Sequence, residues 1–366
     1  MHVVITGNMG YVGPVVVEHL RRSLPQVRLT GIDSGLFAHC LTEGGLPERR
    51  LDAQLFRDVR ELTAEDFAGV DAVIHLAAVS NDPMGSRFEA VTDEINYRAS
   101  VRVAELAAAA GVGHFAFASS CSMYGYAEAG ARSEADELNP LTAYARSKVA
   151  AERDLQALAQ AGGMTVTALR FATACGFSPR LRLDLVLNDF VASALATGRI
   201  AVLSDGTPWR PLIHVADMAR ALEWAITRQA GDDDRFIAVN AGCDEWNYQV
   251  AELAETVSAV IPGTDVEINK DAQPDKRSYR VDFARFRALA PRHQPQVGLA
   301  DAIRDLHAGL VALGFRDAEF RKSDLMRLNV LQKAMDQGRL RPDLRWAPSA
   351  ARAPGGAAAM PPIQAA

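Results

Sequence analysis

The chain has 366 residues, of which 49% are hydrophobic and 23% charged, and its formal net charge is −6. These are ordinary globular values, and the length suggests two domains. A mildly acidic chain is a poor match for nucleic acid or an anionic membrane surface, since both require a basic face. There is no apolar run of about 18 residues and no signal-peptide pattern, so we expect a cytoplasmic protein without membrane spans. The four widely spaced cysteines predict neither a disulfide framework nor a metal site.

Short apolar runs alternate with helical patterns through the first half of the chain. We expect strands over residues 2–6, 27–32, 53–56, 72–76, 114–118 and 165–169, and helices over about 12–24, 88–110 and 142–161. The strands are apolar throughout, which is typical of strands buried on both faces of a parallel sheet. The alternation predicts an α/β fold with a doubly wound parallel sheet.

A glycine-rich loop, Gly7-Asn8-Met9-Gly10-Tyr11-Val12-Gly13, joins the first expected strand to the first expected helix. Gly7 allows a tight turn, Gly10 lets the backbone approach a pyrophosphate, and Gly13 permits close helix–strand packing. The amides at the helix start favour an anion. The strand–loop–helix context predicts a Rossmann-like dinucleotide site formed by Gly7, Gly10, Tyr11, Val12 and Gly13.

Two acidic residues follow the next strands. Asp33 ends the second strand, where a carboxylate accepts both ribose hydroxyls of NAD and repels the extra phosphate of NADP. Asp58, followed by Val59, comes after the third strand and is placed to contact the adenine edge. The simpler interpretation of Asp33 is a turn residue before Ser34 and Gly35. With the glycine loop beside it, we favour an NAD site.

Tyr144 and Lys148 are four residues apart on an expected helix and therefore share one face. A tyrosine with its usual pKa of about 10 is a poor base, but a nearby ammonium and a nicotinamide cation would stabilise its phenolate. Lys148 is the first lysine of a chain that otherwise uses arginine until Lys270. Because an ammonium on a flexible stem differs from a planar guanidinium, this exception indicates a specific task.

The regular alternation breaks near residue 172. A later strand-like run over 236–240 is expected to return to the first sheet, so that the two domains interleave. From about residue 346 the chain consists mostly of Ala, Pro and Gly, which predicts a disordered tail over 346–366.

Together the motifs resemble the extended short-chain dehydrogenase/reductase family. They are the glycine loop, His75-Leu76-Ala77-Ala78, Asn96, Ser119-Ser120-Cys121-Ser122-Met123-Tyr124-Gly125, Tyr144-x-x-x-Lys148 and Arg210-Pro211-Leu212-Ile213-His214-Val215-x-Asp217. The branch most similar is that of NAD-dependent nucleotide-sugar epimerases and dehydratases, typified by UDP-galactose 4-epimerase. The resemblance implies a NAD-binding domain over 1–172 with a returning segment near 236–242, and a smaller, interleaved substrate domain over 173–345.

The resemblance also implies roles for individual residues. Ser120 would bond the sugar hydroxyl, Tyr144 would take the C4 hydroxyl proton, and Lys148 would hold the nicotinamide ribose and lower the pKa of Tyr144. The implied cofactor residues further include Leu76, Ala77, Ala78, Asn96, Phe171, Asp58 and Val59. The implied substrate residues are Ser80, Ser120, Cys121, Ser122, Thr173, Arg180, Arg210 and Arg277.

The chain departs from the pattern of the branch at three places. Its 4,6-dehydratases carry an Asp-Glu pair where Cys121 and Ser122 stand, and many members have an asparagine at Thr173. The usual phosphate-binding arginine is missing near Ala272. Arg180, Arg210 or Arg277 would replace it, because arginine suits a pyrophosphate.

We therefore expect a NAD-dependent nucleotide-sugar epimerase acting at C4, with a nucleoside diphosphate sugar as its partner molecule. A dehydratase, a decarboxylase or a 4-ketoreductase remains an alternative, as does a NAD-sensing regulatory protein. The family resemblance further implies a homodimer paired through the expected helices 88–110 and 142–161.

Overall fold

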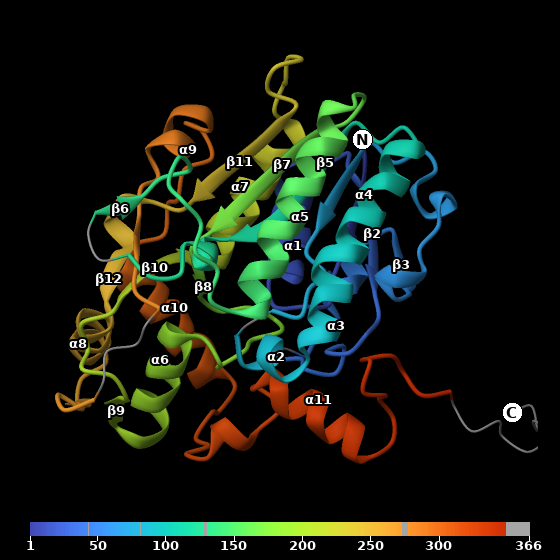
Figure 1. Cartoon of the computed structure of the whole chain (residues 1–366). Helices are drawn as coiled ribbons and strands as arrows, with labels where there is room; N and C mark the ends of the chain where they lie inside the picture. The colour runs from blue at the N-terminus through green and yellow to red at the C-terminus, as the bar shows by residue number, and fades with distance from the viewer. Residues whose placement is uncertain (43, 81, 128–129, 273–276, 349–366) are drawn as a thin grey trace, which may run out of the picture.

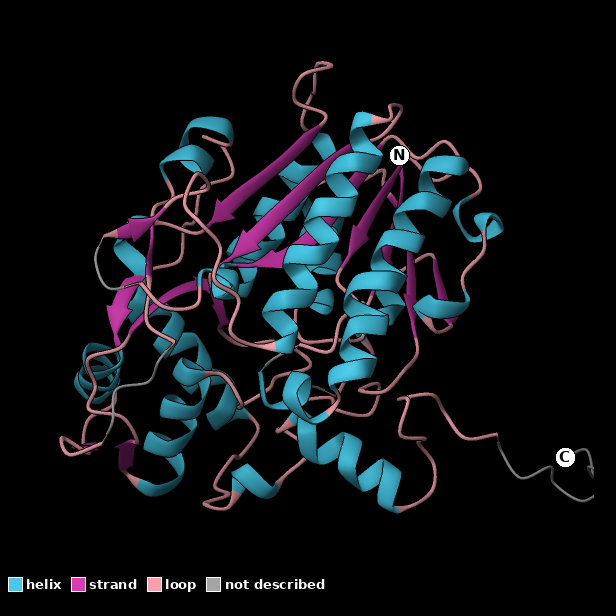
Figure 2. Ribbon diagram, viewed as in Figure 1, coloured by secondary structure: helices cyan, strands magenta, loops and turns pink. Residues whose placement is uncertain are grey.

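A parallel sheet is the centre of the fold (Figures 1 and 2). The computed structural model describes residues 1–42, 44–80, 82–127, 130–272 and 277–348, so residues 349–366 of the expected tail lie outside the described residues. Within these ranges the sheet has seven strands in the order β11-β7-β5-β4-β1-β2-β3, all paired in parallel. The strands are β1 (His2–Thr6), β2 (Arg28–Asp33), β3 (Ala53–Phe56), β4 (Ala72–His75), β5 (His114–Ser120), β7 (Thr165–Phe171) and β11 (Phe236–Ala241).

Helices cover both faces of this sheet, which confirms the predicted Rossmann-like class. On one face lie α1 (Gly13–Ser23) and α7 (Val215–Thr227); on the other lie α4 (Ser100–Ala109) and α5 (Ala143–Gln160). The side chains of Val3 and Ile5 pack toward the first pair of helices, whereas Val4 and Ile32 pack toward the second. Each strand is therefore buried on both sides, which explains its unbroken apolar pattern.

The single helix expected over 88–110 is divided into segments. After α2 (Asp82–Arg87), the chain forms α3 (Glu89–Asp93), a π-helical stretch over Glu94–Ala99 and then α4. Short π-helical stretches inside helices often occur at functional sites. Here the stretch contains Asn96, whose side-chain oxygen accepts the Val79 N–H at 2.7 Å and whose amide donates to the Val79 carbonyl at 3.0 Å.

The second half of the chain builds a smaller region beside the carboxyl ends of the central strands (Figure 1). Its strands form three small sheets: β8 (Thr173–Cys175) with β10 (Trp209–His214) and β12 (Asn247–Gln249), β9 (Arg199–Val202) with β13 (Asp265–Ile268), and β6 (Ala131–Arg132) with β14 (Arg280–Val281). Its helices are α6 (Val186–Thr197), α8 (Val250–Val260), α9 (Ala284–Leu289), α10 (Leu299–Ala312) and α11 (Arg327–Asp336). Since β11 pairs with β7, the chain enters this region, returns to the central sheet and leaves it again.

The helix α11 and the residues after it depart from the expected division. Figure 1 shows α11 below α2 and α3, away from α8 and α9 of the substrate region. Its Leu331, together with Leu340 and Leu344, is buried in the apolar cluster that contains Ile32 and Val59. Trp346 pairs with Leu340 across a short antiparallel bridge, so the ordered chain extends beyond the predicted boundary of the tail. Among the described residues, no helix combines the length and the apolar character that a bilayer span requires.

The first turn of α1 allows a stability prediction. A Cβ atom on Gly13 would lie 2.1 Å from the carbonyl oxygen of Asn8, whereas a Cβ atom on Gly113 would come no closer than 3.5 Å to the Asp71 carbonyl. We expect Gly13→Ala to lower the free energy of unfolding by about 1–3 kcal/mol, as overpacking does, and Gly113→Ala to leave it nearly unchanged. Urea unfolding measures both, and equal midpoints for the two variants would contradict the expected contact.

Candidate active site

A cavity of about 1010 Å³ opens at the carboxyl ends of the central strands, between the two halves of the chain. Ligands of doubly wound folds bind in this position. The cavity brings together most of the predicted site residues. Those that line it are Gly7, Gly10, Tyr11, Val12, Gly13, Asp33, Asp58, Val59, Leu76, Ala77, Ala78, Ser80, Ser120, Ser122, Tyr144, Lys148, Phe171, Thr173, Arg210 and Arg277.

The glycine loop lies against the loop that follows β4. Gly7 has a φ of +74°, and a Cβ atom there would lie 2.5 Å from the backbone nitrogen of Ala77. The N–H of Gly10 donates to the Gly7 carbonyl at 3.1 Å, which closes the turn before α1. A side chain at Gly7 would thus separate two of the backbone segments that line the cavity, so this position needs glycine.

The backbone holds the Asp33 carboxylate in place. One oxygen accepts the Met9 N–H at 3.0 Å and the other accepts the Gly35 N–H at 2.7 Å. Burial raises the pKa of Asp33, and the two hydrogen bonds oppose that rise. Asp33 therefore ties the glycine loop to the end of β2 while its carboxylate lines the cavity.

Asp58 is engaged by its neighbour Arg60. Its Oδ2 accepts a guanidinium N–H of Arg60 at 2.6 Å, and its Oδ1 accepts the Arg60 backbone N–H at 2.9 Å. Burial acts to raise the pKa of Asp58, but these bonds to Arg60 hold it below its usual value. The carboxylate is thus ionised and fixed at the cavity wall.

Asn96, which the family resemblance placed beside the cofactor, does not line the cavity. It is fully buried behind the loop after β4 and binds both backbone polar groups of Val79, which does line the cavity. Asn96 is therefore a positioning residue for that loop.

The predicted catalytic residues come from β5 and α5. Thr142 caps α5 by accepting the Ala145 N–H at 3.2 Å, which sets the first turn that carries Tyr144. Ser120 ends β5 and hydrogen-bonds to Tyr144. The Lys148 ammonium lies 5.7 Å from the centre of the Tyr144 ring and donates to the Ala118 carbonyl at 2.7 Å.

Burial controls the titration of this pair. It raises the pKa of Tyr144 to about 12, against a lowering by the hydrogen bond between Tyr144 and Ser120. It lowers the pKa of Lys148 to about 7, against the opposing charge of Glu152. The same burial that brings the two residues together thus disfavours the charged form of each.

A buried polar cluster behind Ser120 was not predicted from the sequence. Glu152, one turn after Lys148 on α5, accepts the Ser119 hydroxyl at 2.5 Å and a guanidinium N–H of Arg170 at 2.8 Å. Arg170 also donates to the Tyr124 hydroxyl at 3.1 Å, which in turn donates to Asn240 at 2.8 Å. The spacing of Lys148 and Glu152 on one helix face was the available signal.

Two predicted substrate residues point away from the cavity. Cys121 is 1% exposed and does not line the cavity; its thiol donates to the Arg170 carbonyl at 3.0 Å, and burial raises its pKa well above the usual value. Arg180 is fully buried in an ion pair with Glu48 at 2.6 Å and also lies outside the cavity lining. Neither side chain lines the cavity, whereas Ser120 and Ser122 do.

Arg182, which the sequence did not single out, takes the place expected for Arg180. It lines the cavity, donates to the Ser80 hydroxyl at 2.9 Å and pairs with Asp184 at 2.6 Å. Burial opposes its charge, but Asp184 raises the pKa of the Arg182 guanidinium overall. The cavity lining thus includes Arg182, Arg210 of β10 and Arg277, together with Ser80 and Thr173.

Over most of its length this chain is similar to known proteins. The model of the NAD dependent epimerase/dehydratase family matches residues 3–242. A dTDP-glucose 4,6-dehydratase of Streptomyces griseus is 28% identical over 319 residues, covering 85% of this chain and 92% of that protein. A UDP-glucose 4-epimerase of Streptomyces lividans is 27% identical over 279 residues, covering 70% of this chain and 80% of that protein.

Solved structures share the same fold. The protein MoeE5, solved with UDP-glucose and NAD, superposes with a TM-score of 0.71 at 26% identity, covering 85% of this chain and 99% of that one. A NAD-dependent NDP-hexosamine 5,6-dehydratase, TunA, superposes with a TM-score of 0.74 at 23% identity, covering 87% of this chain and 99% of that one. Both epimerases and dehydratases are thus among the similar proteins.

The fixed Asp33 carboxylate leads to a prediction about the cofactor. We expect the protein to bind NAD more than about tenfold more tightly than NADP, because the added phosphate would meet a carboxylate. In Asp33→Asn, the amide retains one of the two acceptors, so NAD binding should weaken and the preference over NADP should narrow. Calorimetric titration of both cofactors measures this, and equal affinities of the wild-type protein would remove Asp33 from the ribose site.

Lys148 leads to a prediction about pH. The pKa of Lys148 falls from 10.5 to about 7 on folding, so between these values the unfolded chain binds the extra proton. Stability should therefore rise with pH in this window, by up to about 1.4 kcal/mol per pH unit. We expect the difference in unfolding free energy between the wild type and Lys148→Met to grow from about pH 7 to about pH 9. Parallel stability curves of the two NAD-free proteins would show that folding does not lower the pKa of Lys148.

Proposed function

The chain belongs to the NAD-dependent epimerase/dehydratase family, and from that premise we propose that it is a nucleotide-sugar epimerase that inverts C4 through a 4-keto sugar. The family match confirms NAD as the cofactor and the resemblance seen in the sequence. The observation that carries the proposal is the combination of residues on one cavity wall. Ser120, Tyr144 and Lys148 meet there, while Cys121 faces the protein interior.

These side chains suit an oxidation at a sugar hydroxyl. When bound, NAD supplies the acceptor that takes the C4 hydride and gives it back. The Tyr144 phenolic oxygen takes the proton of the C4 hydroxyl, and the Ser120 hydroxyl, hydrogen-bonded to Tyr144, orients that hydroxyl. Lys148 holds the nicotinamide ribose and, when charged, favours the phenolate.

The rest of the cavity suits a nucleoside diphosphate sugar. Arg182, Arg210 and Arg277 all line the cavity, whose lining also includes Thr173, Leu203 and Ser204. Guanidinium groups bind phosphate oxygens in a bidentate manner, which matches a pyrophosphate. The similarity to a UDP-glucose 4-epimerase and to MoeE5 supports this substrate class.

A dehydratase is the second candidate, because a dTDP-glucose 4,6-dehydratase is 28% identical over 85% of the chain. Dehydration requires a base for the C5 proton and an acid for the leaving hydroxyl. Ser122 lines the cavity but is a plain hydroxyl that accepts from Ser120 at 3.0 Å, and the Cys121 thiol has a raised pKa. Neither side chain provides that acid–base pair, so we favour the epimerase.

We also propose that the protein is a homodimer paired through α4 and α5. Val101 and Leu106 of α4 remain half-buried on the outer side of this layer, beside the hydrogen bond from Tyr97 to Asp154 of α5 at 2.5 Å. A cytoplasmic location stays a prediction from the sequence.

Turnover in heavy water distinguishes the two candidates. A C4 epimerase returns the hydride to C4 without removing the proton at C5. We therefore expect an epimeric product with no deuterium at C5 and no 4-keto-6-deoxy sugar. Mass spectrometry and proton NMR of the product measure this. Deuterium at C5 would instead indicate dehydration or C5 epimerisation.

Two variants serve as matched controls for this experiment. Tyr144→Phe should lower turnover by roughly 10²–10⁴-fold while NAD still binds, because only the proton acceptor is lost. Cys121→Ser should keep turnover close to the wild-type level, since its thiol contacts only protein groups. A loss of activity in Cys121→Ser together with C5 exchange in the wild type would favour the dehydratase.

A further inference from the structure

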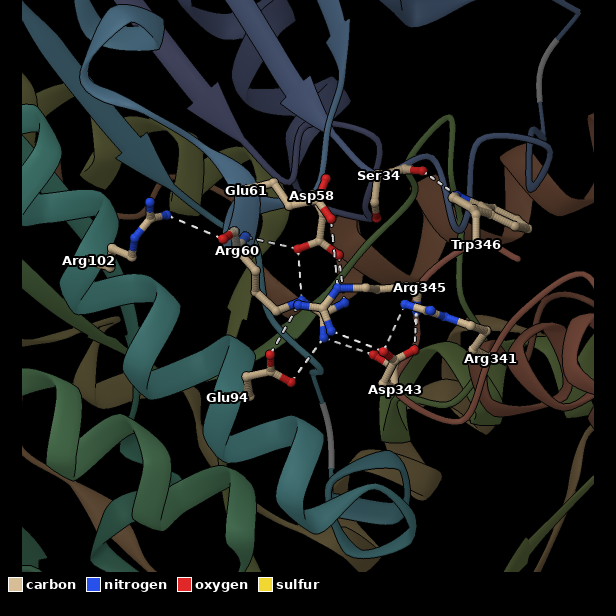
Figure 3. Close-up of polar contacts among 10 residues, drawn as sticks. All are labelled: Ser34, Asp58, Arg60, Glu61, Glu94, Arg102, Arg341, Asp343, Arg345 and Trp346. Atoms are coloured by element: carbon tan, nitrogen blue, oxygen red, sulfur yellow. Dashed lines mark hydrogen bonds and ion pairs between the residues drawn. The ribbon is translucent and has the colours of Figure 1, made fainter. Parts of the chain in front are cut away.

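The last described residues return to the cofactor side of the cavity. Residues 339–347, here called the C-terminal strap, follow α11 and pass beside Ser34 at the end of β2 (Figure 3). The indole N–H of Trp346 donates to the Ser34 carbonyl at 2.6 Å. The strap is thereby anchored one residue from Asp33.

Charged groups fasten the strap at a second point. Arg60 donates to the Asp343 carbonyl at 2.8 Å and to Glu94 at 3.1 Å while it also holds Asp58. Arg345 donates to the Asp343 carboxylate at 3.0 Å and to Glu94 at 3.2 Å. Figure 3 shows these groups converging from the segment after β3, the π-helical stretch and the strap. Arg60 therefore connects the strap to a carboxylate of the cavity wall.

The strap presents a leucine to the cavity at a cost in backbone energy. Leu344 is the one non-glycine among the described residues with a positive φ, at 58°, and its side chain is 2% exposed. A left-handed conformation costs such a residue about 1–2 kcal/mol, and it persists only where the surroundings hold it. Leu344 lines the cavity together with Leu331 of α11 and with Asp58 and Phe37.

The position of these residues identifies the part of the cofactor they meet. In this fold the pyrophosphate lies on the glycine loop and the adenosine ribose lies at the acidic residue that ends the second strand. Asp33, Ser34 and Asp58 mark that adenosine end, and all three line the cavity with Leu344. The strap thus covers the side of the cavity opposite the nicotinamide end, where Tyr144 and Lys148 lie.

We propose that the C-terminal strap is part of the dinucleotide site: Leu344 and Leu331 cover the adenosine half of NAD, and the cofactor leaves only after the strap detaches from Ser34 and Glu94. The consequence is slow exchange of NAD, which suits a reaction that regenerates its cofactor in every cycle. This proposal rests on NAD as the cofactor and holds for an epimerase and a dehydratase alike.

Release of NADH from the full-length protein tests the strap. Bound NADH is displaced by excess NAD, and the fall of its fluorescence in a stopped-flow instrument gives the release rate. Arg345→Ala/Trp346→Ala removes one hydrogen bond and a partly exposed ion-pair group, so we expect release to accelerate about tenfold. Arg339→Ala is the control, because the hydrogen bonds of the Arg339 side chain among the described residues go to Gln337, just before the strap, and not to Ser34 or Glu94. Equal release rates for the double variant and this control would overturn the proposal.

Hydrogen exchange in the wild-type protein provides a second test that needs no variant. NAD binding should slow exchange of the backbone amides of residues 340–346, because the bound adenosine and the strap hold each other in place. Exchange in this segment that is unaffected by NAD would overturn the proposal, even if NAD protects the glycine loop. Neither measurement uses a sugar, so a wrong assignment of the reaction would not alter the result.

Discussion

The buried ion pair between Glu152 and Arg170 determines where the catalytic helix lies. Glu152 belongs to α5 and Arg170 to β7; both are less than a tenth exposed. Glu152 also binds Ser119 of β5, and Arg170 reaches Asn240 of β11 through the Tyr124 hydroxyl. Removing one partner of such a pair leaves an uncompensated buried charge, which typically costs about 3–5 kcal/mol. The distance from Ser120 on β5 to Tyr144 and Lys148 on α5 therefore depends on this pair.

The sequence was sufficient to predict the parts of the site that rest on local chemistry. The glycine loop, Asp33 and the Tyr144–Lys148 pair are each defined by a short segment at a strand end or on one helix face, and all of them line the cavity. The orientation of Cys121 could not be inferred in this way. Ser120 ends β5, and Cys121 begins a 3-10 turn over Cys121–Tyr124, where the alternation of an extended strand no longer applies.

Other parts of the site depend on contacts between distant segments, which no local pattern reveals. Arg180 and Arg182 are two residues apart in one loop, and only the packed structure shows that Glu48 binds the first and the cavity receives the second. The same holds for α11, whose Arg327 is 2% exposed and donates to the Arg180 and Leu181 carbonyls. Burial lowers the pKa of Arg327 to about 10. The hydrogen bonds from Arg327 to those two carbonyls attach α11 to the loop that carries Arg182. Amphipathic pattern alone predicts a helix with a buried face but not the surface it covers.

The return of the chain from the substrate region to the central sheet has a consequence for biosynthesis. Strand β7 ends at Phe171, but its parallel neighbour β11 begins only at Phe236, after α6, β10 and α7. A chain emerging from the ribosome at about 5–20 residues per second leaves β7 as an open sheet edge for several seconds. Such edges invite pairing with other chains. The nascent protein therefore passes through an interval in which chaperone binding at β7 and intermolecular aggregation compete, and that interval closes when Ala241 becomes available to complete the ladder.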